Sequence, residues 1–310
     1  MSSFIPMRWV RLAFFLAAAW SISAGSWGAE HGRLSVAVAE TDLEPIVKAV
    51  GGNQVDTFSL FKGCILRKDL MVEAPAKARL AKADVVIWTG YFNESAAIKA
   101  SSNGTPSKEE AKGMPCKWID VSTGAARVNV PTSVCEGYVD PSLMEGNPFF
   151  WLNPENGPII ARNVAEGLGD LRPEKRAYFL ANATAFNAAL DRDIARWKEE
   201  LKPLEGLRVF CTQCGWQNFS QMGGPTFVVC KGTPGVLPTP DILVDHVKEM
   251  KAQIILLDPN TPPEYGKAFR RETGLKVIDV PSSIESIPGA KSYSALFDSV
   301  VKSLQKAAGK

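Results

Sequence analysis

Histidine is nearly absent from this chain, which has only His31 and His246 in 310 residues. Imidazole is the commonest side-chain ligand for metal ions in proteins, so a metal site built on three histidines is excluded. The chain also lacks a block of basic residues, and its formal charge is 35 − 33 = +2. A nucleic-acid partner is therefore not expected.

Long apolar runs are lacking outside the N-terminus. There, Arg8 and Arg11 precede an apolar run from Leu12 to Trp20, and small residues follow. This order is typical of a secretory signal, and the run is shorter than the ~20 residues that span a membrane. We predict a signal peptide over 1–28, cleaved after Gly28, and a mature chain that is periplasmic or otherwise exported. Disulfides persist in that compartment.

The whole sequence is 45% hydrophobic and 22% charged. After the N-terminal segment, β-rich and helical segments alternate. This alternation predicts parallel sheets covered by helices. Residues 93–117 are polar and predict a loop. The expected strands are 34–39, 55–61, 84–89 and 117–121 in the first half, and 207–211, 226–230, 254–258 and 276–280 in the second.

One long helix is expected between the two halves. Pro173 is typical of a helix start, and a single apolar stripe then runs over 174–201 until Pro203 and Gly206 end it. The predicted fold class is α/β, with two parallel-sheet lobes joined by one long helix. The predicted domains after the signal peptide are an N-terminal lobe over 30–155, linking helices over 156–205 and a C-terminal lobe over 206–310.

Four segments carry a resemblance to a known family. The sequence resembles the periplasmic zinc- and manganese-binding proteins of ABC transporters over nearly all of the mature chain. The resemblance implies a solute-binding protein rather than an enzyme, with a metal ligand and an ABC permease at the inner membrane as partners. The segments are Leu80-Ala-Lys-Ala-Asp-Val-Val-Ile87, Gly146-Asn-Pro-Phe-Phe-Trp-Leu-Asn-Pro-Glu-Asn156, Pro234-Gly-Val-Leu-Pro-Thr-Pro240, and Val280-Pro-Ser-Ser-Ile284 with Tyr293-Ser-Ala-Leu-Phe-Asp298.

The histidines that this resemblance implies are replaced. The loop before the first of these segments contains Cys64 and Lys68, Phe149 follows the Asn-Pro pair, and Gln213 stands in the second lobe. The next strand-to-helix loop opens with Cys230. The remaining histidine, His246, falls in an expected helix over 240–251, and we predict that it is not a ligand.

Six cysteines leave three interpretations open, since six thiols allow 15 pairings. The first is structural disulfides, for which Cys116 and Cys135 form the expected pair. The second is a soft-metal or metalloid site formed by Cys64, Cys214 and Cys230 on both walls of an interlobe cleft. The third is thiol–disulfide chemistry at the Cys211-Thr-Gln-Cys214 pair.

The soft-metal interpretation is the one that we carry forward. Thiolates select ions such as Cu(I) and also hold Zn(II), so the ligand is expected to be an ion of this kind, and no organic cofactor is expected. The alternatives are a thiol–disulfide oxidoreductase, or a relative that binds no metal or an organic ligand in a pocket of Phe149, Phe150, Trp151 and Trp216. The residues expected to line the cleft are Lys68, Phe149, Cys211, Gln213 and Asp258.

Overall fold

The N-terminal half forms a four-stranded parallel sheet in the order β2-β1-β3-β4. The computed structural model describes residues 32–61, 71–90, 92–101, 116–128, 146–212, 215–229, 238–258, 261–286 and 292–309. Strand β1 is buried along almost its whole length, as expected for a parallel strand that is covered on both faces. The strands are β1 Leu34–Glu40, β2 Val55–Phe61, β3 Val85–Trp88 and β4 Lys117–Asp120.

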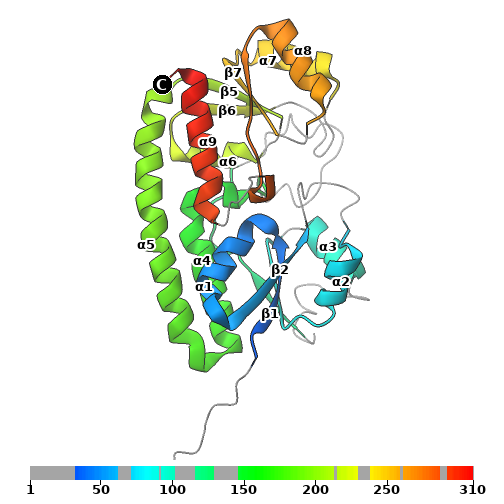
Figure 1. The fold of residues 1–310 in the computed structure, drawn as a ribbon, viewed down its shortest axis with the longest axis vertical. Helices are drawn as coiled ribbons and strands as arrows, with labels where there is room; N and C mark the ends of the chain where they lie inside the picture. The colour runs from blue at the N-terminus through cyan, green and yellow to red at the C-terminus, as the bar shows by residue number, and fades with distance from the viewer. Residues whose placement is uncertain are drawn as a thin grey trace, which may run out of the picture. The chain divides into compact units, whose positions relative to one another are not determined.

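Helices cover both faces of this sheet (Figure 1). Helices α1 (Glu44–Gly51) and α4 (Gly157–Leu171) share a hydrophobic cluster with the side chains of one face, including Val36. The opposite face, which includes Ala37, packs with α2 and α3. Their bounds are Ala74–Leu80 for α2 and Phe92–Ser101 for α3.

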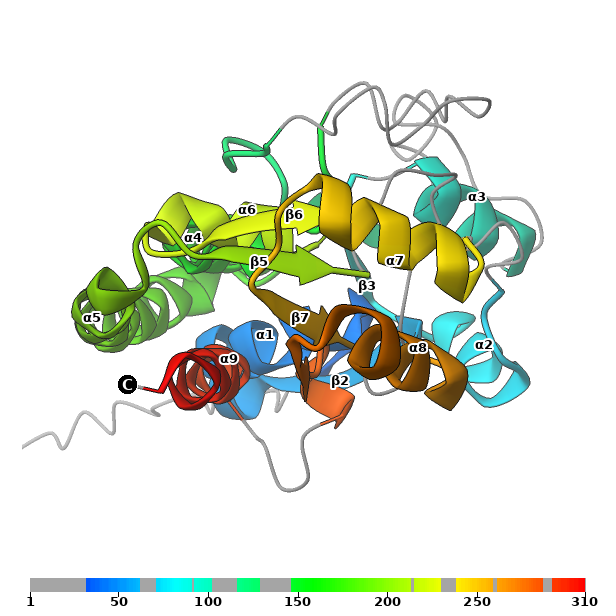
Figure 2. The same ribbon diagram turned by 90° about the horizontal axis from the view of Figure 1, so that it is seen from above.

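The C-terminal half repeats this construction with the strand order β6-β5-β7-β8, all parallel. One face of the sheet packs with α7 and α8, and the other joins the cluster that also contains α9 (Figure 2). The strands are β5 Arg208–Cys211, β6 Thr226–Val229, β7 Ile254–Leu257 and β8 Lys276–Asp279. The helices are α6 Trp216–Phe219, α7 Pro240–Glu249, α8 Pro263–Thr273 and α9 Tyr293–Ala308.

Helix α5, Arg176–Leu201, is the long connection between the two sheets. Its 26 residues span about 39 Å at 1.5 Å per residue. Near its N-terminal end, Asn182 Nδ2 donates to the carbonyl oxygen of Val50 in α1 (2.9 Å). Near its C-terminal end, the carbonyl of Glu200 accepts from Gln305 Nε2 in α9 (3.3 Å). The helix is therefore hydrogen-bonded to both halves.

This architecture confirms the predicted fold class, and the long helix lies where its apolar stripe indicated. The prediction of a loop over 93–117 is wrong for its first part, because α3 forms there. The buried carboxylate of Glu94 fixes the start of α3 by accepting from Thr89 N (2.8 Å) and Thr89 Oγ1 (2.7 Å). By internal contacts Arg33–Lys310 is one compact unit, so the lobe boundaries stay predictions.

Candidate functional site

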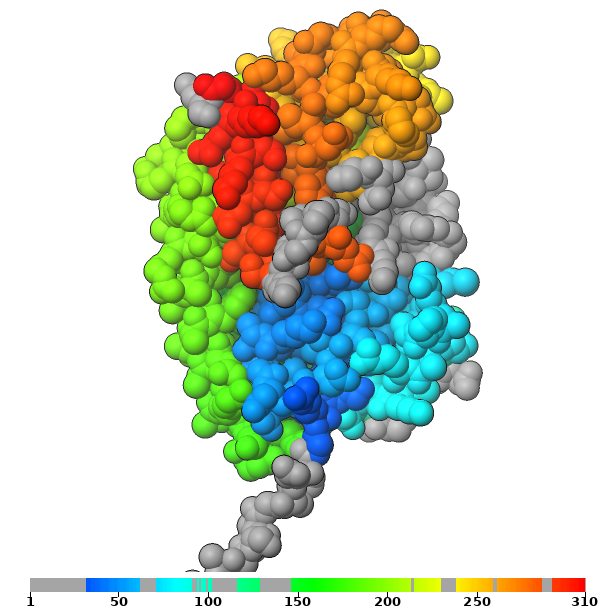
Figure 3. Space-filling view, in the orientation of Figure 1, coloured from blue at the N-terminus to red at the C-terminus, as the bar shows by residue number. Residues whose placement is uncertain are grey.

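The two sheets meet through the segments that follow their strands at the carboxyl ends. Ligands of parallel α/β sheets bind at this end. The turn after β1, Thr41–Leu43, contacts the turn Ile284–Ser286 that follows β8. In the space-filling view the orange-red surface of the second turn lies on the blue surface of the N-terminal half (Figure 3).

Asp42 is the polar centre of this contact. Its Oδ1 accepts from the Ser283 hydroxyl (2.9 Å) and from the Ile284 amide (2.8 Å), and its Oδ2 accepts from Trp151 Nε1 (3.1 Å). Desolvation by burial raises the pKa of the Asp42 carboxyl from 3.8 to about 6, and the charge of Glu285 adds to the rise. The three hydrogen bonds favour the ionised form and limit the shift.

A second contact between the halves involves Phe149 and the segment after β5. The ring of Phe149 is 3% exposed. It packs edge-to-face with Trp151, with 5.4 Å between ring centroids. A Cβ atom at Gly215 would lie 2.6 Å from Leu152 Cδ1 and 3.1 Å from Phe149 Cγ. Only glycine leaves room for this approach, so the position after the Asn-Pro pair packs against the second half.

The four aromatic residues that could have lined an organic-ligand pocket lie in the hydrophobic core instead. Phe150, Trp151 and Trp216 are each at most 1% exposed and belong, with Phe149, to the cluster that runs through both halves. Their rings fill space between the sheets. Their packing therefore gives no support to the alternative of an organic ligand in a pocket of these four side chains.

The Asn-Pro-x-x-Trp-Leu-x-Pro segment is held by buried amides. Asn147 Oδ1 accepts from the Phe149 amide (3.1 Å). Asn156 Nδ2 donates to the carbonyl oxygens of Ala126 (2.7 Å) and Phe150 (2.8 Å), while its Oδ1 accepts from Ala126 N (2.8 Å). These bonds fix the backbone of the segment. Sequence reasoning did not identify Asn156 or Asp42.

Two of the expected cleft-lining residues lie at strand ends of the second sheet. Cys211 is the last residue of β5, is fully buried, and is paired in register with Val229 of β6. Asp258 directly follows β7, and its Oδ2 accepts from the Ser282 amide (3.3 Å) and from the Ser282 hydroxyl. The Asp258 carboxylate thus ties together the segments that follow β7 and β8.

All three cysteines of the proposed thiol site fall outside the described residues. These are Cys64, Cys214 and Cys230, and the same holds for Lys68, Gln213 and Cys135. Within the described ranges, no group of three or more His, Cys, Asp or Glu side chains could hold a metal ion. Any such site therefore needs at least one residue from the other segments.

Cys116 lies just before β4, at the amino edge of the first sheet and away from the carboxyl ends. It is half-buried and is not in a disulfide in this structure, and burial raises the pKa of its thiol. Since its expected partner Cys135 is outside the described residues, the pairing stays a prediction.

His246 occupies α7, as the sequence predicts. The neighbouring Leu243 and Val247 pack into the outer cluster with β5, β7 and α8. This cluster lies on the face of the sheet opposite the one that joins the shared core. The non-ligand role of His246 stays a prediction.

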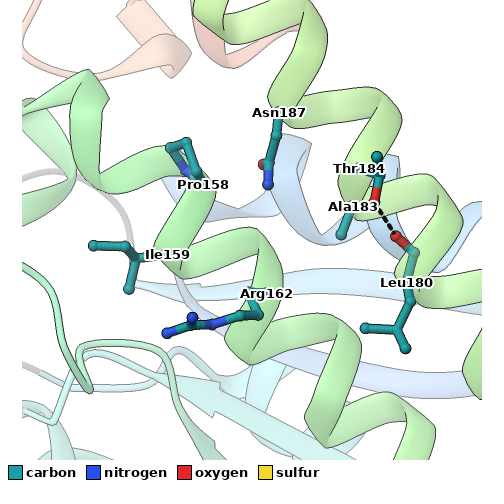
Figure 4. A pocket seen from close by; sticks show the side chains of 7 residues that line it. All are labelled: Pro158, Ile159, Arg162, Leu180, Ala183, Thr184 and Asn187. Carbon is teal, nitrogen blue, oxygen red and sulfur yellow. Dashed lines mark hydrogen bonds between the residues drawn. The ribbon is translucent and has the colours of Figure 1, made fainter.

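A separate hollow lies between α4 and α5 (Figure 4). Its residues come only from these two helices, so it does not belong to the carboxyl-end contact. The hydroxyl of Thr184 donates to the Leu180 carbonyl within α5 (2.9 Å). The lining consists of Pro158, Ile159, Arg162, Leu180, Ala183, Thr184 and Asn187. Across the parts of the chain that the structure describes, no helix is long and apolar enough to cross a membrane.

Comparisons with known proteins agree on one family. The family model described as "Zinc-uptake complex component A periplasmic" matches residues 36–307. The high-affinity zinc uptake system protein ZnuA of Brucella abortus is 28% identical over 165 residues, which cover 50% of this chain and 48% of that protein. The match thus spans about half the length of this relative. The manganese ABC transporter substrate-binding lipoprotein PsaA of Streptococcus pneumoniae is 22% identical, with 79% of this chain and 78% of that protein covered.

Solved structures show the same fold. The crystal structure of ZnuA superposes with a TM-score of 0.70 at 20% identity, covering 89% of this chain and 99% of that one. The solute-binding protein FpvC from Pseudomonas aeruginosa, in complex with Ni²⁺, gives 0.68 at 19% identity over 88% of this chain and 97% of that one. At these identities the likeness establishes the architecture alone.

Proposed function

Because this chain belongs to the family of periplasmic zinc-uptake components, we propose that it is the solute-binding component of a metal-type ABC transporter. In this role it is exported and delivers a metal ion or metalloid to a permease at the inner membrane. The family match over residues 36–307 is the observation that carries the proposal. The two-sheet architecture supports it, since the carboxyl ends of both sheets meet in one region.

The proposed ligands are the thiolates of Cys64, Cys214 and Cys230. Each follows a described strand end in the chain: Cys64 comes three residues after β2, Cys214 three after β5, and Cys230 directly after β6. Because β5 and β6 are paired in register up to Cys211 and Val229, the segments that contain Cys214 and Cys230 leave from adjacent points of the sheet edge.

The chemistry of this donor set differs from that of imidazoles. Three thiolates favour a soft ion such as Cu(I) and can also hold Zn(II). The position of Phe149 supports the change of ligand type, since its ring is buried beside Trp151 and Gly215 and offers no lone pair. The expected geometry is sulfurs about 4 Å apart with metal–sulfur bonds of about 2.3 Å.

Metal stoichiometry of single Cys→Ser variants tests the site. The mature protein is purified anaerobically, its free thiols are counted, and Zn(II) and Cu(I) binding is measured by elemental analysis and by competition with a chromophoric chelator. We expect about one ion per chain in the wild type and at least a tenfold weaker affinity for Cys64→Ser, Cys214→Ser and Cys230→Ser, since each removes one of three ligands.

A matched control uses Cys116, at the amino edge of the first sheet, and its predicted disulfide partner. The double variant Cys116→Ser/Cys135→Ser removes two cysteines that are not proposed ligands, and its metal affinity should equal that of the wild type. If the wild-type protein binds neither Zn(II) nor Cu(I) when its thiols are reduced, the thiolate site is contradicted. That result would favour the alternative that this protein binds no metal. Reduction of a disulfide substrate by the Cys211–Cys214 pair would instead favour the oxidoreductase alternative.

A further inference from the structure

One buried carboxyl accepts hydrogen bonds across the contact between the turn after β1 and the segment at the turn after β8. Asp42 is 6% exposed, and all three groups that bond to it are donors: Trp151 Nε1, the Ser283 hydroxyl and the Ile284 amide. Two of these donors are more than 240 residues away in the chain. We call Asp42 with these three donors the interlobe clasp.

Within the described ranges, the other titratable groups around Asp42 are acidic or neutral. Glu285, from the turn Ile284–Ser286, disfavours the charge on Asp42. Tyr293, from α9, is fully buried; burial is the main cause of the raised pKa of its hydroxyl, and the charge of Asp42 adds to the rise. Glu40 on β1 and Glu44 on α1 precede and follow it in the chain. No basic group is among the causes that shift its pKa.

These surroundings oppose the charged form in the docked arrangement. A carboxylate that leaves water for this site keeps three hydrogen bonds but loses its hydration, and no cation among the described residues contributes to its pKa shift. If the turn after β8 moves away, the same carboxyl becomes hydrated and returns to its ordinary behaviour. The docked arrangement therefore holds the proton of Asp42 more tightly than the opened one.

We propose that the interlobe clasp is a pH-sensitive device, in which proton uptake by Asp42 favours docking of the turn after β8 and ionisation loosens it. The sign follows from proton linkage: the state that binds more protons gains stability as the pH falls. The pKa of Asp42 is about 6 when docked, against 3.8 for the unperturbed carboxyl. Between pH 7.5 and pH 5 the docked-to-open ratio should rise about tenfold. The clasp needs no bound ligand, so it is independent of the proposed transport role.

Hydrogen exchange of the Ile284 amide measures this equilibrium directly, because that amide donates to Asp42 Oδ1 (2.8 Å). After correction for the intrinsic exchange rate at each pH, its protection factor should be about ten times larger at pH 5 than at pH 7.5. In Asp42→Asn the amide side chain keeps an acceptor oxygen but has no titrating proton, so the dependence should vanish.

Two further variants test whether the pH dependence comes from titration of the Asp42 carboxyl, because each should shift its midpoint in a defined direction. Ser283→Ala removes a hydrogen bond that favours the charged form, so the midpoint should move to higher pH. Glu285→Gln removes a repelling charge, so the midpoint should move to lower pH. An unchanged profile in Asp42→Asn overturns the proposal. Should that variant fail to fold, the ¹³C titration of the Asp42 carboxyl in the wild type decides, and a midpoint near 4 overturns it.

Discussion

Phe149 and Gly215 form a matched pair at the scale of single residues. The ring of Phe149 occupies the space that a side chain at position 215 would need. The resemblance implied a histidine after the Asn-Pro pair, whereas the aromatic ring at this position contributes dispersion and apolar burial and has no atom that could coordinate a metal ion. In this structure the position therefore has a packing role.

Truncation of this ring should be strongly destabilising. Because Phe149 is 3% exposed and packs against Trp151 and Gly215, Phe149→Ala should lower the free energy of unfolding by about 3–5 kcal/mol. Phe149→Leu keeps most of the volume and should lower it by less than about 1.5 kcal/mol. Urea denaturation followed by circular dichroism measures both. A change below about 1 kcal/mol for Phe149→Ala would mean that the ring is not part of the core.

Other residue roles had no signal in the sequence. Asp42 is one acid among 33, and its importance comes from a hydroxyl, an amide and an indole brought to it by distant segments. The hydrogen bonds between the Asn156 side-chain amide and the Ala126 backbone likewise join residues that are 30 positions apart. By contrast, the unsuitability of Phe149 as a metal ligand was evident from its chemistry alone.

At the scale of elements, α4 approaches the first sheet so closely that a helical glycine is required. A Cβ atom at Gly167 would lie 2.6 Å from Ile119 Cγ1 and 2.9 Å from Ile119 Cγ2, on strand β4. An exposed glycine inside a helix is normally less favourable than alanine by about 1 kcal/mol. In α4 the close contact with β4 outweighs that preference.

The substitution Gly167→Ala should therefore destabilise the protein by about 1–3 kcal/mol, because the extra methyl group overpacks the α4–β4 contact. Gly266→Ala in α8 is the matched control. Its nearest neighbour is Nη1 of Arg270 at 3.0 Å, the far end of a flexible side chain. A Cβ there would also lie 3.3 Å from Leu257 Cδ1, which is less close than the 2.6 Å at Gly167, so the control should cost clearly less than Gly167→Ala. Thermal unfolding of both variants compares them, and a stabilising Gly167→Ala would refute the close approach.

On the scale of the whole molecule, one hydrophobic cluster runs through both sheets. It includes Val36 and Ile87 of the first sheet, Val209 and Leu256 of the second, and the buried side of α5, among them Trp197. Separate outer clusters lie under α2 and α3 and under α7 and α8. The shared cluster couples the two sheets energetically, because unfolding either half exposes apolar surface of the other.

Native-state hydrogen exchange should reveal this coupling. The amides of β1 and β5 should open with the same free energy, within about 1 kcal/mol, since both depend on the shared cluster. Helices α2 and α8 pack on the outer clusters, so their backbone amides should exchange through local openings that cost less free energy. Exchange of β5 at a free energy more than about 2 kcal/mol below that of β1 would show that the second half unfolds by itself.

The sequence by itself determined the elements and the fold class. Apolar runs, helical stripes and the Pro173 start are local properties, so they placed α5 and α7 and both parallel sheets correctly. The missing histidines likewise excluded the usual donor set from composition alone.

Only the tertiary structure decided what the elements do to one another. The apolar residues of helix α3 do not gather on one face, and the Glu94 carboxylate, which accepts from the residue after β3, anchors the helix. The clasp at Asp42 joins residues 241 and 242 positions apart. Contacts of this kind leave no periodic signal in the chain, and the desolvation that raises the pKa of Asp42 exists only after the surrounding elements have enclosed it.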